Sequence, residues 1–150
     1  MLGSLSPTEI DELLRTEVIA RLGCHSDGRT YVVPITYVYD GGSMIGHSAD
    51  GLKLRMMRQN PAVCVEVDRM DDLANWRSVI AWGRFGELTG AAASAALVTL
   101  RERFRPLMVS ETSQPSHGLR EGETETRSGN GHAALYRILL LEKTGRFERR

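Results

Sequence analysis

The sequence has no excess of charge of either sign. Lys plus Arg and Asp plus Glu each number 19 among the 150 residues, so the formal net charge is zero. A chain with this balance lacks the basic field that holds nucleic acid and the acidic tail that solvates a partner. We therefore expect no nucleic-acid partner, and any anion that binds must be held by local groups.

Cysteines and long apolar runs are also scarce. Cys24 and Cys64 are the only cysteines and have no CxxC spacing, which argues against a disulfide framework or a zinc ribbon and favours buried free thiols. The histidines share no metal-ligand spacing, so no metal site is predicted. No apolar run reaches the roughly 20 residues of a membrane helix, and the N-terminus does not look like a secretory signal. We expect a cytoplasmic protein with no membrane partner.

Helix signals stand at three places. Ser6, Pro7 and Glu9 form the pattern of a helix N-cap with a capping box. Residues 50–59 have helical spacing and end before an Asn-Pro pair, with Asp50 or Ser48 as expected caps. Residues 91–104 are rich in alanine and are followed by a proline. These patterns predict three helices.

Between the helices the apolar period is that of strands. Residues 17–40 read as a hairpin turning at "SDGR", and "SMIGHS" continues it as a meander. Alternating valines, a longer strand with Gly83 and Gly86 as bending points, and a closing apolar strand follow. About six strands in antiparallel order, without regular strand-helix alternation, predict a mainly β single domain over 1–150: a small closed barrel with peripheral helices.

The join between "SMIGHS" and the second helix carries the clearest candidate site. A helix N-terminus presents unpaired N–H groups, to which Lys53 adds a charge and Ser48 a donor, so phosphate is the natural ligand. Alternatively, Lys53 is a solvated surface lysine, Ser48 a cap, and His47 structural. Of Trp76 and Trp82, core packing suits one, and a wall for a planar ligand is possible for the other. No nucleophile with a base is present, so no catalytic residue is predicted.

The order of the motifs resembles one family. "VP-x-x-Y-x-Y-D", "H-S-x-x-G-x-K", "NP-x-V-C-x-E-V-D", "W-x-S-V" and "TGR" occur in the order found in pyridoxamine 5'-phosphate oxidase-like FMN-binding split barrels. The branch related to nitroimidazole resistance proteins is the most similar. The resemblance implies a six-stranded antiparallel split β-barrel and an FMN cofactor.

The resemblance also implies which residues hold FMN. Pro34, Ile35 and Thr36 would lie along the isoalloxazine ring. His47, Ser48, Ala49 and Lys53 would surround the ribityl chain and phosphate. Trp76, Ser78 and Val79 would reach the flavin of a partner across a homodimer interface, which would also cover the apolar closing strand.

The implied function is flavin redox chemistry on a small aromatic or nitroaromatic substrate. The basic C-terminal residues with which family members bind pyridoxamine phosphate have no match in "ALYRILLLEKTGRFERR", which argues against vitamin B6 oxidation. The alternatives are a flavin- or haem-binding carrier or sensor without turnover, and a deazaflavin-dependent reductase. The polar segment 111–131 is expected to be a flap over the flavin or a plain connector.

Overall fold

The computed structural model describes residues 1–108 and 134–150, and the predicted segment 111–131 lies outside them. The strands are β1 (Leu2–Ser4), β2 (Ile19–Ser26), β3 (Arg29–Thr36), β4 (Val38–Tyr39), β5 (Ser43–Ser48), β6 (Ala62–Asp72), β7 (Asn75–Glu87) and β8 (Ala134–Glu148). The helices are α1 (Pro7–Thr16), α2 (Leu52–Gln59), α3 (Gly90–Phe104) and the short 3-10 helix η1 (Arg105–Leu107). None of these helices is long and apolar enough to cross a membrane.

The strands of the described residues form one antiparallel sheet in the order β3-β2-β6-β7-β8-β5-β4, and β1 adds to the end of β8. The predicted mainly β, antiparallel split-barrel class with peripheral helices is therefore confirmed. The strand number differs, because eight strands occur where six were expected. The predicted strand through residue 40 breaks at Tyr37 into β3 and β4, and β1 forms only by pairing with the distant end of β8.

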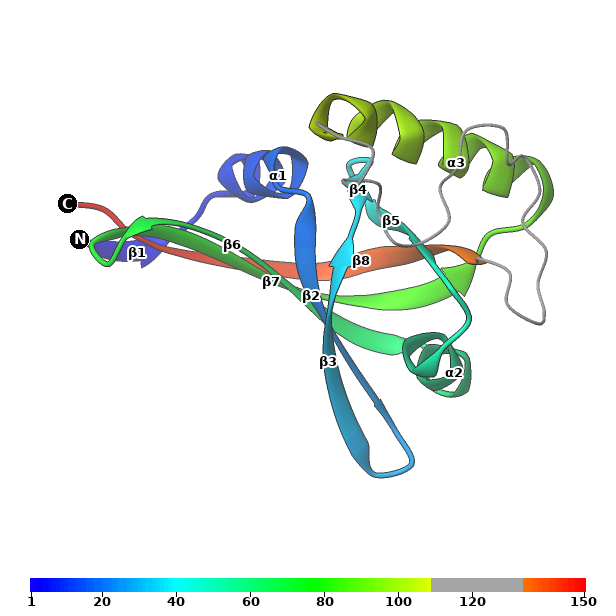
Figure 1. Ribbon diagram of the computed structural model, residues 1–150. Coiled ribbons are helices and arrows are strands. Elements are labelled where there is room, and N and C mark those ends of the chain that lie inside the picture. Colours follow the sequence, from blue (N-terminus) through cyan, green and yellow to red (C-terminus); the bar gives the residue numbers. More distant parts are fainter. Residues whose placement is uncertain (109–133) are drawn as a thin grey trace.

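The curved sheet encloses the main core on its inner face. Alternate residues of the strands point inward and pack against α1 and α2, whose apolar sides contribute Leu13, Leu14, Leu54 and Met57. The helix α3 instead lies on the outer face, where it packs over Ile45 and Leu135. Figure 1 shows α3 above β5, with α1 and α2 at opposite ends of the long strands. The rest of the outer face, over β2, β6, β7 and part of β8, is open in the described residues.

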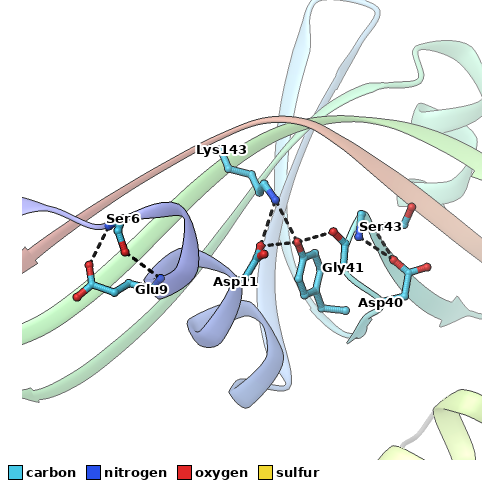
Figure 2. A network of polar contacts seen from close by, with 9 residues as sticks. Ser6, Glu9, Asp11, Asp40, Gly41, Ser43 and Lys143 are labelled. Carbon is cyan, nitrogen blue, oxygen red and sulfur yellow. Dashed lines mark hydrogen bonds and ion pairs between the residues drawn. The ribbon is translucent and has the colours of Figure 1, made fainter.

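The helix α1 is fixed at its start and at its middle by side-chain hydrogen bonds. Ser6 Oγ accepts from the Glu9 backbone N–H at 3.2 Å, and the Glu9 carboxylate accepts from the Ser6 N–H at 2.8 Å, which confirms the predicted capping box. Further along α1, Asp11 accepts from the Tyr39 hydroxyl at 2.7 Å and from Lys143 Nζ at 3.2 Å. Figure 2 shows both groups of contacts, of which the second, through Asp11, ties α1 to β4 and β8.

Candidate functional site

The helix α2 begins without a cap. Its N-cap is Gly51, no side chain of residues 1–108 or 134–150 caps the first-turn N–H groups, and no acidic residue stands in that turn. The expected caps were wrong on two counts. Ser48 Oγ donates to the Ala49 carbonyl at 2.8 Å, and the Asp50 carboxylate accepts from Arg58 at 3.1 Å. The first turn therefore presents N–H groups that a ligand anion can accept from.

Lys53 lies in that uncapped turn. Its side chain is half-buried, and within residues 1–108 and 134–150 no carboxylate pairs with it. Burial lowers the pKa of the Lys53 ammonium group, because the charged form loses water and gains no counter-charge. A desolvated cation beside open N–H groups is the arrangement that a phosphate would complete.

The residues before Lys53 separate onto two faces of β5. His47 pairs with Leu135 and shares the outer face that α3 covers, whereas Ser48 pairs with Ala134 on the inner side. Both are buried, and Ala49 is exposed. A single ligand at the α2 N-terminus can therefore reach Ser48, Ala49 and Lys53 more directly than the His47 ring.

Among the described residues, the strand β3 forms an open edge of the sheet and pairs only with β2. The two strands are joined by a two-residue turn in which Asp27 and Gly28 have positive φ. In such a hairpin Ser26 and Arg29 form a hydrogen-bonded pair, and alternate pairs follow. The backbone groups of Val32, Pro34 and Thr36 consequently point away from β2. Pro34 lacks an N–H, so the outward backbone groups of these residues include a carbonyl from each of them but an N–H only from Val32 and Thr36.

The other residues that are predicted to contact the flavin point their side chains to different faces of the sheet. Pro34 and Thr36 lie on the outer face of the sheet, whereas Ile35 points into the main core. On β7 the same alternation places the half-exposed Ser78 outside and Val79 in the core. Ile35 and Val79 can therefore offer a ligand backbone groups only.

The two predicted ring-contacting segments do not meet within one chain. Two strands, β2 and β6, separate β3 from β7. At about 4.8 Å per strand step, Pro34 and Ser78 lie roughly 14 Å apart across the sheet. The half-exposed Trp76 lies still further along β7, toward its start.

A groove that the sequence did not reveal lies on the outer face. It has a volume of about 470 Å³, and its floor consists of small residues including Gly23, Ala62 and Cys64. Trp82, His25 and Leu141 form its walls. The expectation that one tryptophan packs in the core is wrong: Trp82 is 43% exposed and Trp76 is half-exposed. Trp82 stands an even number of positions from the other outward-facing residues of β7, and this spacing could have indicated that its side chain points outward.

The family of the chain follows from its sequence. A model of the pyridoxamine 5'-phosphate oxidase family matches residues 6–146, so the chain belongs to this family. An uncharacterised protein of Rhizobium meliloti (strain 1021) is 34% identical over 84 residues, which is 56% of this chain and 56% of that protein. The chain thus matches little more than half the length of that relative.

Solved structures share the fold along nearly the whole chain. An FAD-binding protein of Mesorhizobium loti is 26% identical with a TM-score of 0.74, and 98% of each chain is covered. An FAD- and haem-binding protein of Mycobacterium smegmatis has 18% identity and a TM-score of 0.73, with 99% of this chain and 74% of that one covered. A protein described as a 5-nitroimidazole antibiotic resistance protein, from Bacteroides thetaiotaomicron, has 15% identity and a TM-score of 0.63, with 98% of this chain and 87% of that one covered.

Proposed function

We propose that this protein binds a flavin nucleotide, with the phosphate at the N-terminus of α2. The observation that carries the proposal is the half-buried Lys53 beside an uncapped helix turn. A phosphate would supply the counter-charge that Lys53 lacks and would accept from the open N–H groups. The names of the similar proteins support a flavin as the group that carries this phosphate.

The open edge of β3 suits the ring of the same cofactor. The pyrimidine side of an isoalloxazine alternates carbonyl, N–H and unprotonated nitrogen groups, as a peptide strand alternates acceptors and donors. The backbone of Val32, Pro34 and Thr36 can exchange hydrogen bonds with such an edge and needs no side chain to do so. Pro34 and Thr36 would also contribute their outward side chains.

We assign FMN as the cofactor. Because Lys53 is half-buried, a phosphate drawn against it has little room for the adenosine that FAD attaches to that phosphate. Two of the similar proteins named above are described as FAD-binding, so the comparison of the two cofactors is the decisive test. Isothermal titration of the flavin-free protein should give a lower Kd for FMN than for FAD. A lower Kd for FAD would identify FAD as the cofactor in place of FMN.

The activity that we propose is oxidoreduction of a small aromatic or nitroaromatic compound. When bound, the flavin supplies the electron transfer, and the chain positions the ring and excludes water. None of the residues at this site forms a nucleophile-base pair. The test is anaerobic reduction of the flavin-loaded protein, followed by addition of a nitroaromatic compound. Recovery of the oxidised flavin spectrum in proportion to compound consumed supports the activity, and no recovery argues for a carrier.

We further propose a homodimer that is formed through the open outer face. Ile80, Trp82, Leu139 and Leu141 expose apolar side chains there, and Leu141 is 68% exposed. A contiguous apolar surface of this kind is rare on a monomer. A partner's β7 would also bring Trp76, Ser78 and Val79 toward β3, from which they are distant within one chain. Light scattering should give a dimer mass, and a monomer that retains full flavin affinity would disprove the arrangement.

Haem binding is the second candidate, and the groove beside Trp82 favours it. His25 lines this apolar groove, and its Nδ1 lies 3.0 Å from Thr30 Oγ1, which orients the imidazole ring and leaves Nε2 as a possible ligand. Addition of hemin should then produce a Soret band that shifts in His25→Ala. An unchanged band in that variant would exclude His25 as the ligand.

A further inference from the structure

The carboxylate that lies nearest in sequence to the uncapped turn of α2 belongs to Asp50, directly before the N-cap Gly51. An aspartate at the start of a helix is well suited to accept from first-turn N–H groups, and it is stabilised by the positive end of the helix dipole. In this protein it does not do so, because no side chain caps α2. The Asp50 carboxylate instead pairs with Arg58, from the last turn of the same helix.

Arg58 is itself fixed at a second point. Its Nε donates to the Glu87 carboxylate at the end of β7, while its Nη1 donates to Asp50 at 3.1 Å. The two carboxylates raise the pKa of the guanidinium, with Glu87 as the larger cause, so Arg58 stays charged at every working pH. One arginine thus connects β7, α2 and the residue that precedes the α2 N-terminus.

We propose that Arg58 is a positioning residue that withholds the Asp50 carboxylate from the first turn of α2 and so keeps that turn available to a phosphate. Without Arg58, Asp50 would act as an internal anion. It would accept from the N–H groups that the ligand needs and would repel the phosphate near Lys53. This inference rests on the proposed function, since it concerns the same phosphate site.

A double-mutant cycle tests the role of Arg58. Arg58→Gln should raise the Kd for FMN about fivefold, the size of effect expected of an anion at a helix N-terminus. Asp50→Asn should leave the Kd at or below the wild-type value. The double variant Asp50→Asn with Arg58→Gln should bind FMN within about twofold of wild type, because the competing charge is gone.

The control is Arg29→Gln, which removes the same charge from an exposed arginine at the β2–β3 turn. It should not change the Kd. The Arg58→Gln effect should also shrink in about 0.5 M salt, which screens an exposed charge but would not correct a misplaced helix. If Arg58→Gln does not fold, Arg58→Lys with and without Asp50→Asn repeats the cycle with the charge retained.

The outcomes separate this inference from the proposed function. Wild-type affinity in Arg58→Gln, or a loss that Asp50→Asn does not rescue, would overturn the role of Arg58 while flavin binding stands. A wild-type protein that binds neither FMN nor FAD would overturn the proposed function. The same cycle would then be measured with inorganic phosphate, from the NMR shifts of the amides of Leu52 to Leu54. Absence of those shifts in wild type would overturn the inference as well.

Discussion

The first two helices of this protein begin in opposite ways. At α1, a capping box uses Ser6 and Glu9, and the following turn pairs Asp11 with Lys143 and Tyr39. At α2, the N-cap is a glycine, the first turn has no acid, and Lys53 has no carboxylate partner in the part of the chain that the structure describes. The capping box of α1 is satisfied within the chain, whereas the first turn of α2 is the place where we propose that a phosphate binds.

This difference is one reason for the phosphate site that we propose at α2. A protein optimised only for stability would cap both helices, because a cap adds about 1 kcal/mol. Stability is commonly given up where function requires open groups. The start of α3 also lacks a side-chain cap from residues 1–108 or 134–150, so the missing cap alone does not distinguish α2. What distinguishes α2 is the half-buried Lys53 in its uncapped turn, which has no carboxylate partner among the described residues.

Removal of the Lys53 side chain should have the largest effect on FMN binding at the proposed α2 site. Lys53→Ala should weaken FMN binding by about 1.5–3 kcal/mol, the size of a hydrogen bond to a charged group, while the protein stays folded. Lys143→Ala is the matched control, because it removes the lysine that pairs with Asp11 near α1. Calorimetric titration should give an unchanged Kd for the control. Equal affinity in both variants would return Lys53 to the role of a surface lysine.

Removal of the α1 cap should act on stability alone. Ser6→Ala loses the hydrogen bond to the Glu9 N–H and should cost about 1 kcal/mol in urea unfolding, with FMN affinity unchanged. Thr89→Ala provides the comparison, since Thr89 is the N-cap of α3 and forms no side-chain cap bond. Thr89→Ala should lower the free energy of unfolding clearly less than Ser6→Ala does. Equal costs would mean that the capping bond of Ser6 adds nothing.

A cap introduced at the N-terminus of α2 should make that helix start resemble the capped start of α1. Gly51 has an extended backbone, and a Cβ there meets only the Ala49 carbonyl at 3.9 Å, so Gly51→Asp needs no rearrangement. The variant should gain a few tenths of a kcal/mol in unfolding free energy and lose FMN affinity. Gly51→Asn should give the same gain with a smaller loss of affinity, because it caps without charge. Improved FMN binding in Gly51→Asp would contradict the phosphate site.

The smallest expected effect is a pH dependence that belongs to α1. The hydrogen bond from the Ser6 N–H, aided by Arg149, lowers the pKa of Glu9 to about 2 from its ordinary value of 4.5. Because the folded pKa is the lower one, Glu9 stabilises the fold above pH 4.5, and this contribution is lost as the pH falls toward 2. Urea unfolding at a series of pH values should show a shallower fall in Glu9→Gln. Parallel curves would remove Glu9 as a source of acid sensitivity.

Local patterns allowed the sequence to predict α1 and the first hairpin. Ser6, Pro7 and Glu9 specify their cap within four residues, and the Asp-Gly turn adopts the positive φ values that a two-residue hairpin needs. The split-barrel class and the family were also predictable, from the order of the motifs. The short strand β1 was not, because it exists through its pairing with β8 and no local signal marks it. The residues of β4 were predicted as strand, but the break at Tyr37 that separates them from β3 was not.

The site shows the same limit. That His47 and Ser48 face opposite sides of β5, and that Ile35 and Val79 point inward, follows from strand alternation once the core face is known. The sequence alone did not fix which face that is. The pairing of Asp50 with Arg58 joins residues at opposite ends of one helix, so helical spacing does not predict it. The proposed cofactor contacts themselves remain predictions.

The open edge of β3 has one further consequence, for solubility. An exposed strand edge is a template on which another chain can add a strand and begin to aggregate. Pro34 interrupts this edge near its middle, because it offers no N–H and its ring obstructs an approaching backbone. A small ring needs only a few consecutive backbone groups, but an added strand needs the whole ladder. Pro34 thus discourages self-association through strand pairing and leaves the β3 edge uncovered for the flavin ring that we propose there.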